Sequence, residues 1–190
     1  MVFNHKIIND KDAYGWGPVL LHWLVALAIF GLYALGLYME DLDYYDDGYH
    51  TLPEWHKAVG ILVALLLALR LVWRVLNPPP ELLPQPSWQV FLAKWAHRTL
   101  YLLLGLTLLS GYLMSTADGH PIAPFNWFSI PALPISIDKQ EDIAGELHEL
   151  FADLMIILSM IHALAAFKHH FFNKDATLKR IFALREKHNE

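Results

Sequence analysis

The sequence contains no cysteine among its 190 residues. Disulfides, thiolate metal sites and a haem attached through a C-x-x-C-H motif are therefore all excluded. The chain is also poor in charge, with 17% charged residues, and it has no compact basic segment that would suggest a nucleic-acid partner. It is instead 55% hydrophobic and 13% aromatic, with eleven histidines. Together with a mean hydropathy of +0.31, this composition predicts an integral membrane protein embedded in a lipid bilayer.

Four apolar segments are suited to helices that cross a bilayer. The first has 21 residues without a formal charge, which is too long for the core of a signal peptide. The second has a shorter uncharged part, but the charged residues at its ends can snorkel to the membrane surfaces. A run of prolines or acidic residues separates each segment from the next. Pro18 is placed near the first helical position of the first segment, where its missing N–H costs nothing. The four predicted helices are Gly17–Met39, Pro53–Leu76, Trp88–Thr116 and Gly145–Asp175.

The positive charges are unevenly distributed over the segments that connect these helices. Four crossings put both termini on one side, and that side carries twelve of the fourteen Lys and Arg residues. Because positive residues favour the cytoplasmic side, both termini are expected to be cytoplasmic. The outer side has Lys57, Lys139 and eleven carboxylates. We therefore expect an all-α membrane protein, with residues 1–175 forming a four-transmembrane-helix bundle and residues 176–190 a basic cytoplasmic tail.

Four histidines lie inside these helices at depths that match in pairs. His148 and His162 are fourteen residues apart, so they lie roughly 21 Å apart along the helix axis and point to nearly the same side. His22, near the cytoplasmic end of the first helix, matches the depth of His162, and His56 on the second helix matches His148. Any one of them is explained equally well by a hydrogen bond between helices, but an unpaired histidine in hydrocarbon is costly. We expect two ligand pairs, one at each face of the membrane.

The type of ligand favours haem over a bare metal ion. Two nitrogen ligands without a cysteine or a carboxylate pair make a poor zinc site, whereas two imidazoles fill both axial positions of a haem iron. With both positions filled, the iron is expected to exchange electrons rather than bind a small molecule. Small residues one turn after each histidine leave room for a flat macrocycle: Ala26, Gly60, Ala152 and Ala166. Two non-covalent haems b between the helices are therefore expected.

Further polar residues lie near the cytoplasmic ends of the helices. Arg70 and Arg74 are candidates for binding haem propionates, since guanidinium groups pair well with carboxylates. His97 and His169 are candidates for binding propionates or a quinone head group. Ordinary snorkelling of positive residues is an equally good explanation for each of these. Asp153, about one and a half turns past the outer histidine, is expected to point away from the haem, as an interfacial residue or in a proton relay.

These features together resemble the bacterial cytochrome b561 family, four-helix di-haem b cytochromes of the inner membrane. The matching pieces include LLHWLVALAIFGLYALGLYM, AHRTLYLLL and LSGYLMSTADG, and the most specific is H-x13-H followed by KHHFF-x-KD-x-TL-x-R. The resemblance implies a multi-pass inner-membrane protein with His22 and His162 on one haem b, and His56 and His148 on the other. It also implies that His169 occupies a quinone-binding position. Members exchange electrons with the ubiquinone pool, and some oxidise superoxide at the periplasmic side.

The function that we expect is transmembrane electron transfer between the quinone pool and a periplasmic one-electron donor or acceptor. Whether this oxidoreductase is an enzyme with a substrate of its own is left open. Superoxide oxidation coupled to quinone reduction is one alternative, although an acidic outer surface would repel superoxide. A haem-anchor subunit of a larger oxidoreductase is another, and it predicts co-purification with a catalytic subunit. A non-redox transporter that uses histidines is the third, and it predicts a colourless protein.

Overall fold

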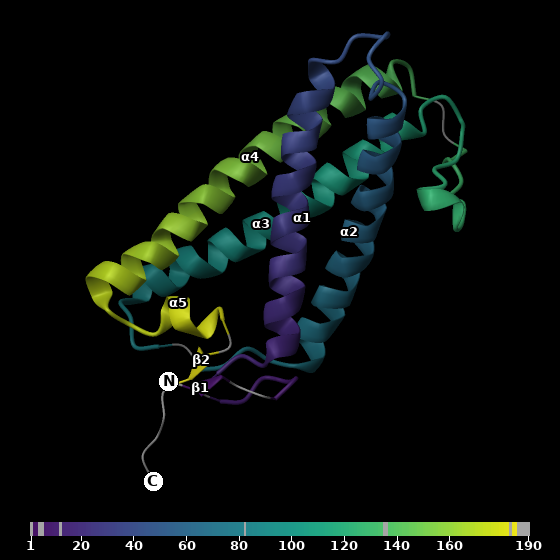
Figure 1. Cartoon of the computed structure of the whole chain (residues 1–190). Coiled ribbons are helices and arrows are strands. Elements are labelled where there is room, and N and C mark those ends of the chain that lie inside the picture. The colour runs from purple at the N-terminus through teal and green to yellow at the C-terminus, as the bar shows by residue number, and fades with distance from the viewer. Residues whose placement is uncertain are drawn as a thin grey trace. The chain divides into compact units, whose positions relative to one another are not determined.

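The computed structural model describes residues 2–3, 6–11, 13–81, 83–134, 137–182 and 184–185. Four long helices make up most of it (Figure 1), and each corresponds to one of the four predicted segments. The fourth helix begins five residues earlier than predicted. Its first turn carries Glu141 and Asp142, whose negative charges complement the positive end of the helix dipole. The helices are α1 (Trp16–Glu40), α2 (Thr51–Leu76), α3 (Ser87–Ser115) and α4 (Gln140–Lys168).

Several short elements complete the described chain. A single π-helical turn, η2 (His169–Asn173), follows α4, and a 3-10 turn, η1 (Pro124–Asn126), lies in the loop before it. The last helix, α5 (Thr177–Arg180), has four residues. Strand β1 (Val2–Phe3) pairs antiparallel with β2 (Leu184–Arg185), so the two ends of the described chain lie next to each other (Figure 1). This two-residue pairing and an isolated antiparallel bridge between Ile122 and Ile130 depart from the all-α prediction.

Three of the helices are long and apolar enough to cross a membrane: α1, α2, and α4 together with η2. Helix α3 has the same length as α4 but is not one of these three, and its first half carries Lys94 and Arg98. Its second half contains hydroxyl groups that bond within the helix: Thr107 donates to the Leu103 carbonyl at 2.9 Å, and Ser110 to the Leu106 carbonyl at 2.8 Å. The architecture is that of a helical membrane protein.

The chain divides into two compact units, each assembled from segments far apart in the sequence. The first unit comprises residues 1–26, 66–98 and 158–190, and the second comprises residues 27–65 and 99–157. Large apolar side chains are widely exposed in both, as at Leu27 and Leu164, which are 65% and 62% exposed. Such a surface is suited to contact with lipid rather than with water.

The chain after α4 folds back within the first unit. The Asp175 carboxylate accepts a hydrogen bond from the Thr177 amide at 2.8 Å, at the start of α5. The indole of Trp23 on α1 donates to the Ile181 carbonyl at 3.1 Å and stacks on Phe182, with ring centroids 5.4 Å apart. Part of the predicted tail, residues 183 and 186–190, lies outside the described residues. The described part is attached to α1 through these contacts.

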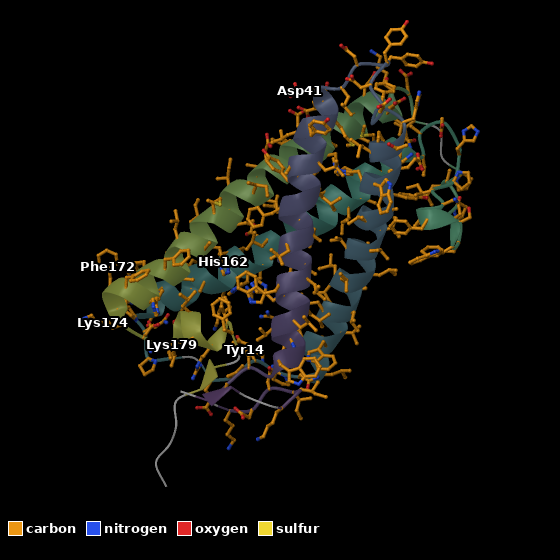
Figure 2. The ribbon with its side chains drawn as sticks, in the orientation of Figure 1. Tyr14, Asp41, His162, Phe172, Lys174 and Lys179 are labelled. Carbon is orange, nitrogen blue, oxygen red and sulfur yellow. The ribbon has the colours of Figure 1, made fainter. Side chains whose placement is uncertain are left out.

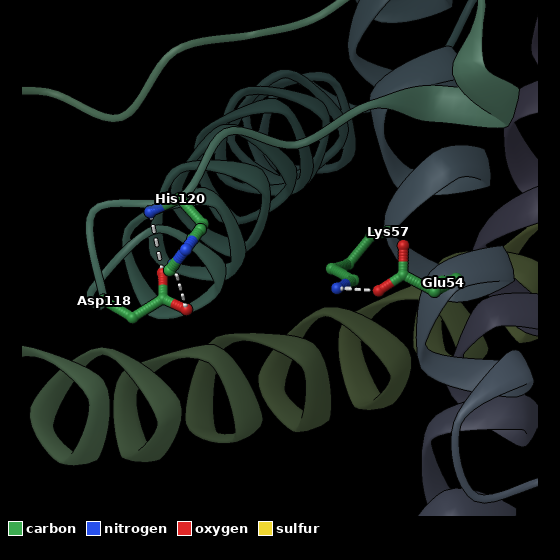
Figure 3. Close-up of polar contacts among 4 residues, drawn as sticks. All are labelled: Glu54, Lys57, Asp118 and His120. Carbon is green, nitrogen blue, oxygen red and sulfur yellow. Dashed lines mark hydrogen bonds and ion pairs between the residues drawn. The ribbon is translucent and has the colours of Figure 1, made fainter.

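The loops of the second unit are held by short polar contacts (Figure 3). Asp118 pairs with the His120 ring at 3.0 Å, and Lys57 pairs with Glu54 on α2. The hydrogen bond from the backbone N–H of His120, reinforced by its ring, lowers the pKa of Asp118. Farther along, Tyr112 donates from its hydroxyl to the Pro131 carbonyl at 2.7 Å. The contacts of Asp118 and Tyr112 order the aromatic, proline-rich loop between α3 and α4 without any disulfide.

Candidate functional site

The second unit brings His56 of α2 and His148 of α4 together. Their ring centroids lie 6.1 Å apart, and the ring planes are inclined by 72°. Two imidazoles on opposite sides of one metal ion have metal–nitrogen distances of about 2 Å each, which places their ring centres about 6 Å apart. The separation of this pair therefore suits two axial ligands of one iron atom.

The ring of His148 is fixed by α3. Its Nδ1 lies 2.8 Å from the Thr107 carbonyl oxygen, so this nitrogen carries the proton and donates the hydrogen bond. Nε2 is then left with a free lone pair, which is the arrangement found in metal-binding histidines. The ring also lies against the backbone of Gly111, where a Cβ atom would come within 2.9 Å of Nδ1. The sequence pattern does not single out Thr107, and its only signal for Gly111 is a glycine inside an apolar helix.

His56 is the less restrained partner. Its Nδ1 atom is buried and has no hydrogen-bond partner among the described residues. Its ring lies near Gly36 of α1, where a Cβ atom would be 3.8 Å from Cε1. Beside Gly60, one turn farther along α2, a Cβ atom would meet nothing within 4 Å. An imidazole with an unpaired buried nitrogen, next to open space, fits a haem ligand.

The first unit gathers three imidazoles, from His22 of α1, His97 of α3 and His162 of α4. His162 lies on the C-terminal half of α4 (Figure 2), and its ring contacts that of His97 edge to face, with centroids 5.0 Å apart. His22 interacts electrostatically with both of them. The sequence had paired His22 with His162, and the structure adds His97 to this group at a shorter separation than trans ligands need.

Two arginines accompany these histidines. The positive charge of Arg70 interacts electrostatically with His22 and His97, and that of Arg74 interacts with His97. Arg70 also donates to the Pro18 carbonyl of α1, at 3.5 Å. By contrast, Arg98 lies over the Trp95 ring, 5.9 Å from its centroid. The two α2 arginines thus place positive charge beside the imidazoles, where the propionates of a haem would need it.

His169 belongs to a different group of polar residues, in the π-helical turn after α4. Its Nδ1 lies 2.7 Å from the Asp175 carboxylate and 3.0 Å from the Asn173 amide nitrogen. Burial alone would raise the pKa of Asp175, but hydrogen bonds from Thr177 and His169 outweigh it and lower this pKa below its ordinary value. The arrangement holds the imidazole in one orientation at the end of α4.

The donor set suits haem better than a bare ion. Among the described residues, no group of three or more His, Asp or Glu side chains could hold a metal ion. Two imidazoles supply two coordination positions, so the others must come from the cofactor itself. A porphyrin would supply four of these positions, and His56 and His148 are the residues that would hold its iron.

Comparison with known proteins gives consistent matches over nearly the whole chain. Residues 13–183 match the family model for prokaryotic cytochrome b561. The chain is 48% identical over 174 residues to cytochrome b561 homolog 2 of Escherichia coli K12, covering 91% of this chain and 93% of that protein. It is 28% identical over 172 residues to cytochrome b561 homolog 1 of the same strain, covering 88% and 96%. It is 25% identical over 166 residues to a Yersinia pestis protein named probable superoxide oxidase CybB, covering 85% and 90%.

Proposed function

The chain belongs to the prokaryotic cytochrome b561 family, and on that premise we propose that it carries electrons across the bacterial inner membrane through two bis-histidine haems b. Membership confirms the resemblance seen in the sequence motifs. It also establishes electron transfer through haem in a membrane as the general activity. The proposal adds the number of haems, their ligands and the partners, which are the quinone pool and a periplasmic one-electron donor or acceptor.

The observation that carries the proposal is the geometry of the His56–His148 pair. The two rings are 6.1 Å apart, and the Thr107 carbonyl holds His148 in the tautomer that leaves Nε2 available. A haem b bound there supplies a one-electron iron couple. The chain's part is to fix both axial ligands in place, so that little reorganisation accompanies the change of charge. We place this outer site on the periplasmic side.

For the inner site we propose His22 and His162 as the axial ligands. His97, Arg70 and Arg74 then border the cofactor, and the two arginines hold its propionates. The electrostatic contacts of His22 and His97 with these arginines support this assignment. His97 is the more exposed of the three imidazoles, which suits a residue at the edge of the site.

The pairing of the chain ends supports four crossings. The pairing of β1 with β2 supports a position of both described ends on one side of the membrane, which goes with an even number of crossings. Three apolar helices alone would separate the ends, so α3 is the natural fourth span. Its stretch from Thr99 to Ser115 carries no charge. The bias of twelve positive residues against two supports a cytoplasmic position for both ends.

We propose that the quinone binds near His169. Nδ1–H of this imidazole donates to the Asp175 carboxylate, which leaves the Nε2 lone pair to accept a hydrogen bond from the O–H group of a quinol. The site lies at the end of α4 that we assign to the cytoplasmic face. A lipid-soluble quinone can reach such a site from the bilayer, and the inner haem, also bound by α4, is its expected electron partner.

Superoxide oxidation coupled to quinone reduction is the second candidate function. The Yersinia pestis relative, whose name includes superoxide oxidase, favours it. The acidic loops of the present chain oppose it, because their charge repels an anionic substrate. The two functions are distinguished by comparing how far the haems are reduced by generated superoxide and by a quinol of the same reduction potential.

The test of the proposed function is haem stoichiometry in detergent-purified protein. We expect two haems b per chain, with reduced-minus-oxidised spectra that respond to quinol. His56→Ala and His148→Ala should each lose the same single haem, and the double variant should lose no more. One haem in the wild-type protein would refute the two-site proposal, and none would support the transporter. Stable co-purification of a periplasmic catalytic subunit would instead identify a haem-anchor subunit.

A further inference from the structure

A carboxyl group of α4 and a phenol of α1 meet in the second unit. The Tyr33 hydroxyl of α1 donates to Oδ1 of Asp153 on α4 at 2.7 Å. Asp153 is the one charged residue of α4 between Glu149 and His162, and Tyr33 lies in the 21-residue uncharged run of α1. Both residues are half-buried in helices that are long and apolar enough to cross a membrane.

Among the described residues, the charges that act on the phenol of this pair are negative. The charges that act on Tyr33 are those of Asp153, Glu40 and Glu149, and all three are carboxylates. In this unit the ionisable groups of α2 are His56 and the Glu54–Lys57 ion pair. The part of α3 that belongs to the unit, residues 99–115, contains tyrosines but no charged side chain.

A carboxylate inside a membrane span is costly, and such residues commonly mark proton or ion pathways. The Tyr33 hydroxyl offsets part of this cost, because a hydrogen bond to a charged oxygen is roughly twice as strong as a neutral one. It does not remove the charge. Asp153 can lower the remaining cost by binding a proton, after which the carboxyl group and the phenol still share a hydrogen bond.

The outer haem site is close enough to influence that proton. Asp153 follows His148 by five residues, which corresponds to about 7.5 Å along the helix axis and about 140° around it, so the two side chains leave α4 on different sides. The two groups are therefore farther apart than the axial rise, but in a low-dielectric interior charges at roughly 10–15 Å still interact much more strongly than they do in water. An electron that arrives at the outer site therefore favours proton binding at Asp153, and by linkage a bound proton favours the electron.

We propose that Asp153, held by Tyr33, is a proton-binding site coupled to the redox state of the outer haem. The inference rests on the proposed function, since it requires a haem at the His56–His148 pair. For each electron accepted from a quinol or a periplasmic donor, the Asp153 carboxylate takes one proton from water. When the electron leaves to the acceptor, the O–H bond breaks and the proton returns to water.

Optical redox titration of the purified di-haem protein between pH 5.5 and 8.5 tests the coupling. In the wild-type protein the electron affinity of the outer haem should fall as the pH rises, by up to about tenfold per pH unit. This corresponds to about 59 mV per pH unit for a one-electron couple. Asp153→Asn keeps an oxygen that accepts from Tyr33 but cannot bind the proton, so it should abolish this slope. Tyr33→Phe removes the donor to the carboxylate, so it should move the sloping region to higher pH.

Glu40→Gln is the matched control, because it removes the same charge from an exposed position at the end of α1 and should retain the slope. As a second measurement, the redox-difference infrared spectrum should show a carboxylic-acid C=O signal that Asp153→Asn lacks. A flat wild-type slope, an unchanged slope in Asp153→Asn, or loss of the outer haem in that variant overturns the proposal. Haem content tests the proposed function separately: two haems with a flat slope refute only the proton site.

Discussion

Replacing Gly111 with alanine is the sharpest test of how His148 is positioned. The added Cβ atom would lie 2.8 Å from Cε1 and 2.9 Å from Nδ1 of the His148 ring. Ordinary contacts begin near 3.4 Å, so the ring has to retreat by about 0.5 Å. The same movement stretches the 2.8 Å hydrogen bond from Nδ1 to the Thr107 carbonyl. The substitution therefore disturbs the orientation of one proposed ligand, His148, and leaves the other, His56, in place.

The expected magnitude follows from two opposing terms. Overpacking by one methyl group typically costs 1–3 kcal/mol, whereas alanine in place of glycine favours the helix by about 1 kcal/mol. Global stability should therefore change little. If the overpacking cost falls on the haem-bound state, affinity for the outer haem drops by about 5- to 150-fold.

The assay is haem content and the reduced-minus-oxidised spectrum after purification with limiting haem. Gly105→Ala is the control on the same helix, because its Cβ atom would meet nothing within 4 Å, and it should retain both haems. Full outer-haem occupancy with an unshifted spectrum in Gly111→Ala would show that His148 does not bind iron from the position described here.

Three further predictions follow from the remaining contacts. His22→Ala should lose one haem while His97→Ala retains two, as pigment analysis of the purified variants can show; the opposite result would make His97 the ligand. Because the folded-state pKa of Asp175 is lowered, its contribution to stability is present above about pH 4 and lost as the pH falls through that pKa. Trp23 fluorescence, obtained by subtracting the spectrum of a Trp23→Phe variant, should therefore change on acidification below about pH 4, and a constant signal would contradict this. Glu54→Gln should alter thermal stability by less than about 1 kcal/mol in a denaturation assay, because exposed ion pairs contribute little; a larger loss would indicate a buried role.

The sequence predicted the helices well because their signals are local. The uncharged run from Val19 to Met39 and the proline run after Leu76 set boundaries that the structure reproduces within a few residues. The start of α4 was predicted too late, because Glu141 and Asp142 resemble a solvated loop until the helix dipole is considered. The positions of the helices could thus be predicted from composition and from helix-breaking residues alone.

The site was accessible only in part. Depth matching along the helices paired His56 with His148, and the structure brings their rings together. The bond from His148 to Thr107 and the hydrogen bond between Tyr33 and Asp153 depend on helix rotation, which depth alone does not determine. The proximity of His97 to the inner histidines was missed for the same reason. Side-chain partners across helices require the packing, which the sequence pattern does not specify.

The division of the chain into two units also determines which unit is completed first during synthesis. Every residue of the second unit precedes residue 158, whereas the first unit needs residues 158–190 as well. Because the ribosome releases the N-terminal part first, His56 and His148 are both available before His162 is made. The proposed outer ligand pair is therefore complete in the nascent chain while the proposed inner pair still lacks a member. Under that proposal, cofactor loading during biogenesis can begin at the outer pair, and the inner site is completed by a segment that is translated later.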